Sequence, residues 1–232
     1  MKPFYLFCIL TTLAVTAPVT GYVNEPTSRP VTQPATGPAV ALDQATPQGA
    51  VTSYYAALSM GDAAAIGILL DGGDNPGAED HVAALARFAA AQYRVDNAFK
   101  NAFGRQINAS TGVSTPDPVV VPETAVRALS GTYCLVLVNG NSSPIPVVKK
   151  EGKWRIDFSD VVALVSPEMR PAFIRTGDAQ IRALDAVATQ IAAGDFATPE
   201  DAEAAVVRMR AEAIDAAMRE ERSRTSESSD ER

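Results

Sequence analysis

The feature that most constrains the fold of this chain is a change in the spacing of its apolar side chains. In residues 46–103 the apolar positions recur at helical spacing, whereas in Thr132–Phe158 short apolar runs alternate with turns. The first pattern is typical of helices and the second of strands. Together they predict an α+β fold, with N-terminal helices against a curved antiparallel sheet and further helices at the C-terminus.

Two short helices and one long helix are predicted before the strands. Thr46 and Asp62 each provide a side chain that caps a helix start, and Gly61 favours the left-handed conformation that ends the first helix. A turn at 71–77 precedes a long helix over 78–103, which Gly104 ends. The predicted core positions of these helices are Val51, Tyr54, Tyr55, Leu58, Ile66, Leu69, Leu70, Leu85, Phe88, Val95, Phe99 and Phe103.

Strands are predicted at 125–129, 133–138, 145–149 and 154–158, with a short extended piece at 119–121. The turns between them have the spacing of an antiparallel meander. Trp154, Ile156 and Phe158 share one side of the last strand, so we expect them in the core. Asp157 points the other way and is assigned to solvent. Pro146 predicts that its strand lies at a sheet edge or carries a bulge, because proline lacks an N–H donor.

The last third of the chain is predicted to be helical. Apolar positions between 181 and 191 predict a helix that Gly194 ends, and Thr198 begins the next helix. The 200–222 helix has a thin, alanine-rich face, so we expect it to be loosely held and a chain ending at residue 196 to fold without it. These patterns divide the chain into an α+β domain at 46–165, C-terminal helices at 166–222 and a disordered tail at 223–232.

Residues 1–21 are predicted to be a signal peptide. Lys2 precedes an apolar run, Phe4–Ala17, that is shorter than the roughly 20 residues of a membrane span. Residues 22–45 are rich in proline and threonine and have no helical period, which predicts a disordered linker. The two segments predict export to the periplasm or the medium. The alternative is an anchor formed by an uncleaved N-terminal segment.

Charge and residue counts argue against several kinds of chemistry. The net charge of −7 and the lack of a basic cluster predict that nucleic acid is not a partner. With one histidine and two cysteines, the chain is not expected to hold a metal or another cofactor. Cys134 lies within an apolar strand, and we predict a small buried side chain there in place of a nucleophile.

Two motifs carry a resemblance to a known family. The motif P-x-x-A-V-x-x-Y-Y-x-A-L-x-x-G-D at Pro47–Asp62, together with EGKWRID at Glu151–Asp157, resembles the nuclear-transport-factor-2-like superfamily, and exported bacterial members in particular. The resemblance covers about residues 46–165. It implies a bent sheet that wraps a long helix into a cone, often with a pocket at the open end. Members include polyketide-cyclase-like and dehydratase-like enzymes and many non-catalytic modules, so it implies a fold more than a function.

Candidate site residues are few. His81 stands beside Asp80 in the first turn of the long helix, where adjacent side chains point in different directions, so we expect a solvated histidine and not a general base. Asp157 is the other acid–base candidate. Tyr54 and Tyr55 can line a pocket, but their spacing favours the core. No catalytic, ligand-binding or metal-binding residue is therefore assigned.

The predicted function is that of an exported, non-catalytic module that binds a small apolar ligand or a protein partner. Two alternatives stay open at this point. One is a pocket enzyme of polyketide-cyclase or dehydratase type, which would use His81 or Asp157. The other is an envelope structural or interaction protein whose C-terminal helices make the contacts.

Overall fold

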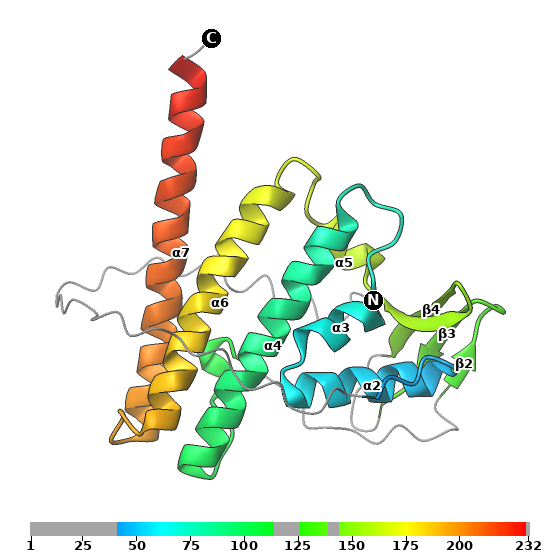
Figure 1. The fold of residues 1–232 in the computed structure, drawn as a ribbon, viewed down its shortest axis with the longest axis horizontal. Helices are drawn as coiled ribbons and strands as arrows, with labels where there is room; N and C mark the ends of the chain where they lie inside the picture. Colours follow the sequence, from blue (N-terminus) through cyan, green and yellow to red (C-terminus); the bar gives the residue numbers. More distant parts are fainter. Residues whose placement is uncertain (1–40, 114–125, 139–143, 231–232) are drawn as a thin grey trace.

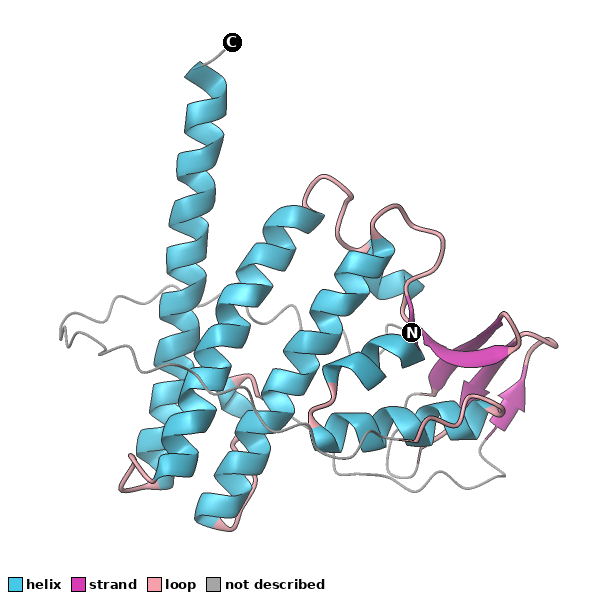
Figure 2. Ribbon diagram, in the orientation of Figure 1, coloured by secondary structure: helices cyan, strands magenta, loops and turns pink. Residues whose placement is uncertain are grey.

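The computed structural model of this chain describes residues 41–113, 126–138 and 144–230, with side chains as far as residue 224. The predicted signal peptide, most of the predicted linker and the extended piece at 119–121 lie outside these ranges. The described residues form an α+β fold, as the sequence predicts, with a sheet on one side of a layer of helices (Figures 1 and 2).

The elements follow one another as α2 (Pro47–Met60), α3 (Ala63–Leu69), β1 (Leu70–Asp71), α4 (Ala78–Phe103), the short 3-10 helix η2 (Ala109–Thr111), β2 (Val126–Ala128), β3 (Tyr133–Val136), β4 (Ile145–Lys150), β5 (Lys153–Asp157), α5 (Ser159–Ala163), α6 (Arg170–Ala193) and α7 (Pro199–Asp230).

The predicted helix ends in the first half are confirmed. Thr46 Oγ1 accepts a hydrogen bond from Gly49 N at 2.9 Å and caps α2. Gly61 ends α2 with φ +64°, and Asp62 Oδ1 accepts from Ala65 N at 3.0 Å to cap α3. Leu70, which we expected at the end of the second helix, is instead in strand β1. It gains backbone partners there, because β1 pairs with β5 in parallel register.

The five strands form one sheet in the order β1-β5-β4-β3-β2. The pairs β2–β3, β3–β4 and β4–β5 are antiparallel, but β1–β5 is parallel. The prediction of a wholly antiparallel sheet is therefore wrong at one edge. A two-residue strand has too few residues to show a period, so the sequence pattern did not reveal β1.

Pro146 does not lie at an edge, because β4 runs between β3 and β5. Lys149 N donates to Thr132 O at 2.8 Å. The backbone N–H and C=O groups of Lys149, and of every second residue of β4 from it, therefore point toward β3. The backbone of Pro146 therefore faces β5. The pairing of β4 with β5 runs from Lys150 to Val147 and ends there, one residue short of Pro146. Proline has no backbone N–H, but at this position the pairing with β5 has already ended, so no strand hydrogen bond is lost.

A first core lies between α2, α3, one side of α4 and one face of the sheet. Trp154 and Ile156 are 7% and 2% exposed, which confirms their predicted orientation, while Phe158 is only half-buried against this core. The chain just before α2 also joins it. Gln44 O accepts a hydrogen bond from Trp154 N at 2.9 Å, although we expected the disordered linker to continue to residue 45.

A second core lies on the other side of α4, which packs beside α6, with α7 on the far side of α6 (Figure 1). Its large buried side chains are Val95, Phe99, Ile107, Val113, Leu184, Val187, Ile191 and Val206. Helix α4 therefore contributes buried side chains to both cores.

Helix α6 begins at Arg170, well before the predicted apolar positions at 181–191. Its first turns make polar contacts, which apolar spacing does not reveal. Arg175 makes a two-nitrogen contact with Glu221 of α7, with the shortest nitrogen–oxygen distance at 2.6 Å.

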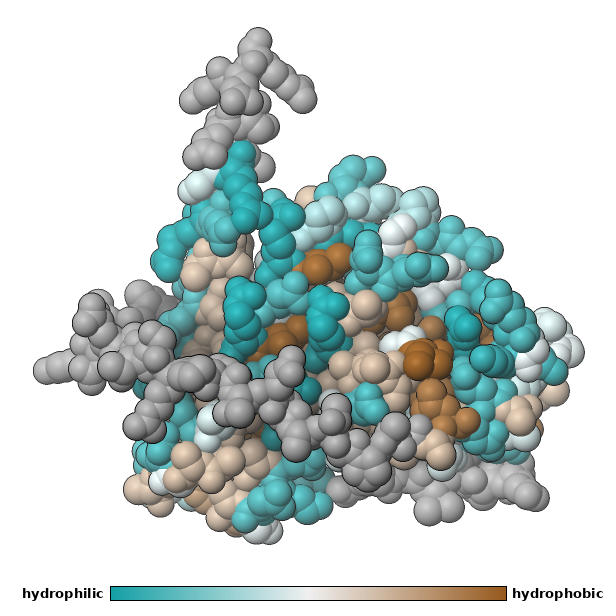
Figure 3. Space-filling view, viewed as in Figure 1, coloured by the Kyte–Doolittle hydropathy of each residue, from teal (hydrophilic) through white to brown (hydrophobic). Residues whose placement is uncertain are grey.

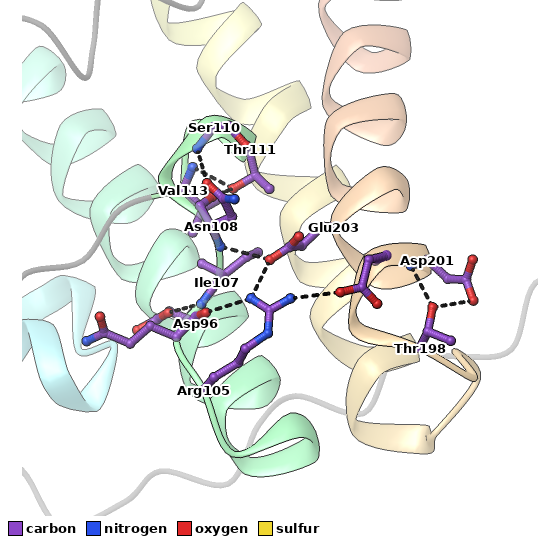
Figure 4. Close-up of polar contacts among 12 residues, drawn as sticks. Asp96, Arg105, Ile107, Asn108, Ser110, Thr111, Val113, Thr198, Asp201 and Glu203 are labelled. Atoms are coloured by element: carbon purple, nitrogen blue, oxygen red, sulfur yellow. Dashed lines mark hydrogen bonds and ion pairs between the residues drawn. The ribbon is translucent and has the colours of Figure 1, made fainter.

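Helix α7 is more firmly packed than its thin apolar face predicts, so the expectation of a loosely held helix is wrong for its first half. Ala202 and Val206 are fully buried. In addition, Glu203 Oε1 accepts from Arg105 Nη1 at 2.8 Å and from Asn108 N at 3.0 Å, which ties the loop after α4 to α7 (Figure 4). Small alanines permit this close approach, and polar contacts add to it.

The tail expected to be disordered from residue 223 continues α7 to Asp230 (Figure 1). Its residues include neither glycine nor proline, and an ion pair joins Glu220 to Arg224 one turn later along the helix.

Ending the chain at residue 196 is expected to unfold the protein or to lower its free energy of unfolding by about 3–5 kcal/mol, because Ala202, Ala205 and Val206 lose their burial. Urea denaturation measures this change. A chain ending at residue 222 is the control: it keeps the Arg175–Glu221 contact and should stay within about 0.5 kcal/mol of the full chain. A 196-residue chain as stable as the control would contradict this packing.

Candidate functional site

An open cleft of about 1050 Å³ lies between the outer side of α3, the turn after β1, the first turns of α4 and the hairpin that joins β4 to β5. Ile68 of α3 lines it and is 51% exposed. In Figure 3 most of the face shown is hydrophilic, and hydrophobic residues come to the surface in the region of α3 and α4.

The turn at residues 72–77 forms one wall of the cleft and depends on its glycines. A side chain at Gly72 would come within 2.9 Å of both Ala78 Cβ and Val82 Cγ2. Gly73 has φ +70° and donates its N–H to Asp71 Oδ2 at 3.2 Å. Asn75 Nδ2 closes the turn on Gly72 O at 3.0 Å. The turn is therefore fixed in position, which gives the cleft a defined wall.

Lys150 of β4 bridges two carboxylates in the cleft. Its Nζ lies 3.0 Å from Asp71 Oδ1 and 3.2 Å from Asp74 Oδ1. The Asp71 side chain is 9% exposed and the Asp74 side chain is 99% exposed, so the inner pair is the structural one. The hydrogen bond to Asp71 raises the pKa of Lys150, with Asp74 acting in the same direction. Lys150 is thus held protonated and is not available as a base.

The lining of the cleft is charged and has more acids than bases. Its carboxylates are Asp71, Asp74, Glu79, Asp80 and Glu151, and its cations are Arg87, Lys150 and Arg155. Arg87 is engaged outside the cleft, because its Nη2 lies 2.8 Å from Asp178 of α6. Arg155 Nε is buried and has no hydrogen-bond partner among the described residues. The cleft is therefore suited to a polar or positively charged group.

His81 does not lie in this cleft and is not solvated, so our expectation for it is wrong. The side chain is 1% exposed and stacks on Phe173 of α6, with 4.8 Å between ring centroids. Helix α6 packs along this side of α4, and its N-terminus is also held to the loop before α4 and to α5 through Arg170. The guanidinium of Arg170 donates to Val165 O, Pro76 O and Val162 O.

The surroundings of His81 favour its neutral form. Burial lowers the pKa of His81, and the charge of Arg170 lowers it further. His81 Nδ1 is buried without a hydrogen-bond partner among the described residues. This position makes His81 part of the α4–α6 contact, and the structure does not bring it together with a carboxylate as an acid–base pair.

The other sequence candidates lie away from the cleft. Tyr54 and Tyr55 are 9% and 2% exposed and meet edge to face in the first core, as their spacing predicts. Cys134 is free and buried, which agrees with its predicted packing role. Asp157 faces away from Trp154 and is half-buried, and its Oδ1 accepts from Ser159 N at 2.9 Å at the start of α5.

Sequence reasoning missed the residues that define the cleft, including Asp71, Lys150 and Arg155. The sequence pattern predicts Asp71 only as part of the turn at 71–77, and Lys150 lies just outside the strand predicted at 145–149. The hydrophobic alternation of β5 places Arg155 opposite Trp154, but that pattern alone does not show that a loop from residues 72–77 comes beside it.

Within the described ranges, no group of three or more histidine, cysteine, aspartate or glutamate side chains is arranged to hold a metal ion. In the same ranges, no helix is both long enough and apolar enough to cross a membrane.

No family model, curated protein or solved structure matches this chain. The resemblance to the nuclear-transport-factor-2-like superfamily therefore stays a prediction from the two motifs.

The burial of His81 predicts a loss of stability in acid. Because the folded-state pKa lies below the ordinary value of 6.5, the unfolded chain binds more protons than the folded chain as the pH falls below that value. The contribution is complete above pH 6.5 and decreases toward acid, with a slope of up to about 1.4 kcal/mol per pH unit.

Urea denaturation at a series of pH values between roughly 5 and 8 tests this. His81→Phe is the matched variant, because it keeps an aromatic ring against Phe173 and cannot titrate. We expect a flatter pH profile for His81→Phe than for the natural chain. Parallel profiles would show that other groups cause the acid sensitivity.

Proposed function

We propose that this protein is an exported, non-catalytic binding module, and that the cleft between α3, α4 and the β4–β5 hairpin receives a polar, positively charged segment of a protein partner. The observation that carries this proposal is the charge of the cleft lining, with five carboxylates against three cations. Export is proposed from the apolar N-terminal segment alone.

The charged lining favours a protein segment over a small apolar ligand. An apolar molecule in this cleft would displace water from Asp71, Lys150 and Arg155 without replacing its hydrogen bonds, and such desolvation is unfavourable. A lysine- or arginine-containing segment would instead meet the exposed carboxylates of Glu79 and Asp80 at the rim. The open form of the cleft also admits a continuous chain.

A pocket enzyme of the polyketide-cyclase or dehydratase type would need a general acid or base in the cleft. The two residues that the sequence offers for this role do not line the cleft: His81 is packed against Phe173, and Asp157 Oδ1 accepts a hydrogen bond from Ser159 N at the start of α5. These two observations support a binding role.

We also propose that residues 46–165 are a variant of the cone-like nuclear-transport-factor-2-like fold. The supporting features are two short helices and a long helix, followed by antiparallel strands, in the order that the resemblance implies. In this chain α2 and α3 contact the sheet, and α4 also packs against α6.

Site-specific photo-crosslinking in the producing cells tests the binding proposal. A photoreactive amino acid is placed either at Ile68, which lines the cleft and is 51% exposed, or at Met60, which lies outside it and is 50% exposed. We expect a discrete protein adduct at position 68 and none at position 60.

Charge reversal then tests the role of the cleft. Glu79→Lys should weaken the adduct at position 68 by about five-fold or more, because it reverses a rim charge. Glu212→Lys changes an exposed position of α7, outside the cleft, and is the control. It should leave the adduct unchanged. Equal adducts at positions 60 and 68, an adduct insensitive to Glu79→Lys, or a small apolar molecule found with the purified protein by native mass spectrometry would contradict the proposal.

A further inference from the structure

Helix α7 forms the outer edge of the helical layer (Figure 1). It has a second apolar stripe, on the side of the helix opposite its buried residues. Its inner side packs on the second core through Ala202, Ala205 and Val206. A different set of residues is exposed or half-buried. It consists of Ala204, Val207, Ala211, Ile214 and Met218, with Val207 48% and Met218 41% exposed.

The exposed stripe has the spacing of a coiled-coil seam. Its five positions are separated by three, four, three and four residues, which is the a/d pattern of a heptad repeat. The inner stripe already serves the contact with α6, so this second stripe is additional to what the fold of one chain requires. We call it the outer seam of α7.

One side of the outer seam has charges that complement themselves. Arg208 and Asp215 are exposed, lie seven residues apart and both flank the seam on the same side. Among the described contacts neither takes part in an ion pair, although Glu212 and Arg219 lie four residues further along the helix from each of them. An opposite charge from another helix can therefore meet each of them.

We infer that the outer seam binds a second copy of this chain, with the two α7 helices antiparallel. In this arrangement Ala211 faces Ile214 of the second copy, and Val207 faces Met218 of the second copy. Arg208 then lies close to Asp215 of the second copy, and the two-fold symmetry makes this contact twice.

The antiparallel direction follows from the flanking residues. A parallel pair would bring residues 203 and 210 toward the charges of the second helix. Glu203 is already bound to Arg105 and Asn108, and Arg210 is 5% exposed and donates to Thr111 O at 2.6 Å. Only the flank that contains Arg208 and Asp215 is free to form contacts between helices.

The expected dimer is weak and reversible. From residue 204 to residue 218 the seam is about 21 Å long, and three of its five side chains are alanine or valine. It buries less than the roughly 1,600 Å² of a standard interface, so association is expected at protein concentrations of roughly 10 µM to 1 mM.

Sedimentation velocity of the full chain over this concentration range tests the inference. Ala211→Glu places a charge in the seam, and Ala216→Glu makes the same change at an exposed position on the opposite side of the same helix. We expect the natural chain and Ala216→Glu to associate alike, and Ala211→Glu to associate at least ten-fold more weakly. Circular dichroism melts confirm that each variant is folded.

Charge exchange tests the antiparallel pairing separately. Arg208→Glu and Asp215→Arg should each weaken association, and the double variant R208E/D215R should restore it. A natural chain that stays monomeric at every concentration overturns the inference and leaves the outer seam to a different protein. Equal losses for Ala211→Glu and Ala216→Glu, or a double variant as weak as the single ones, also overturn it.

Discussion

The burial of α4 on two sides is the constraint on which the rest of the structure depends. Val82, Ala86 and Ala90 of this helix belong to the first core, while Ala91, Val95 and Phe99 belong to the second. A helix buried on two sides needs partners on both, and here α2, α3 and the sheet cover one side while α6 covers the other. The C-terminal helices are therefore part of one folded body with the sheet.

The same arrangement decides where chemistry is available. Covering α4 with α6 buries the one histidine of the chain against Phe173 and places Arg170 among backbone carbonyls. The start of α4 stays open on the side of α3, and there Asp71 and Lys150 hold a charged cleft in a fixed geometry. The buried histidine is thus part of the contact between helices, and the open cleft is the place where we propose that a partner binds.

Much of the fold could be predicted from local sequence patterns. Thr46, Gly61 and Asp62 set helix ends by short-range hydrogen bonds and backbone preference, and these predictions are confirmed. Strand β1, the early start of α6 and the burial of His81 could not be predicted, because each depends on a partner far away in the sequence. The cleft was missed for the same reason: Asp71 and Lys150 come together only when β1 joins the sheet beside β5.

Hydrogen exchange of a variant in the second core tests most directly whether α4 couples the two cores. Leu184→Ala removes a fully buried side chain of α6 and should cost about 2–5 kcal/mol. If the cores unfold together, the slowest-exchanging amides of β4 and β5 should lose protection by the same factor as those of α6, although Leu184 contacts only the second core. Unchanged protection in β4 and β5 beside faster exchange in α6 would contradict the account, because it would show that the helices unfold without the sheet.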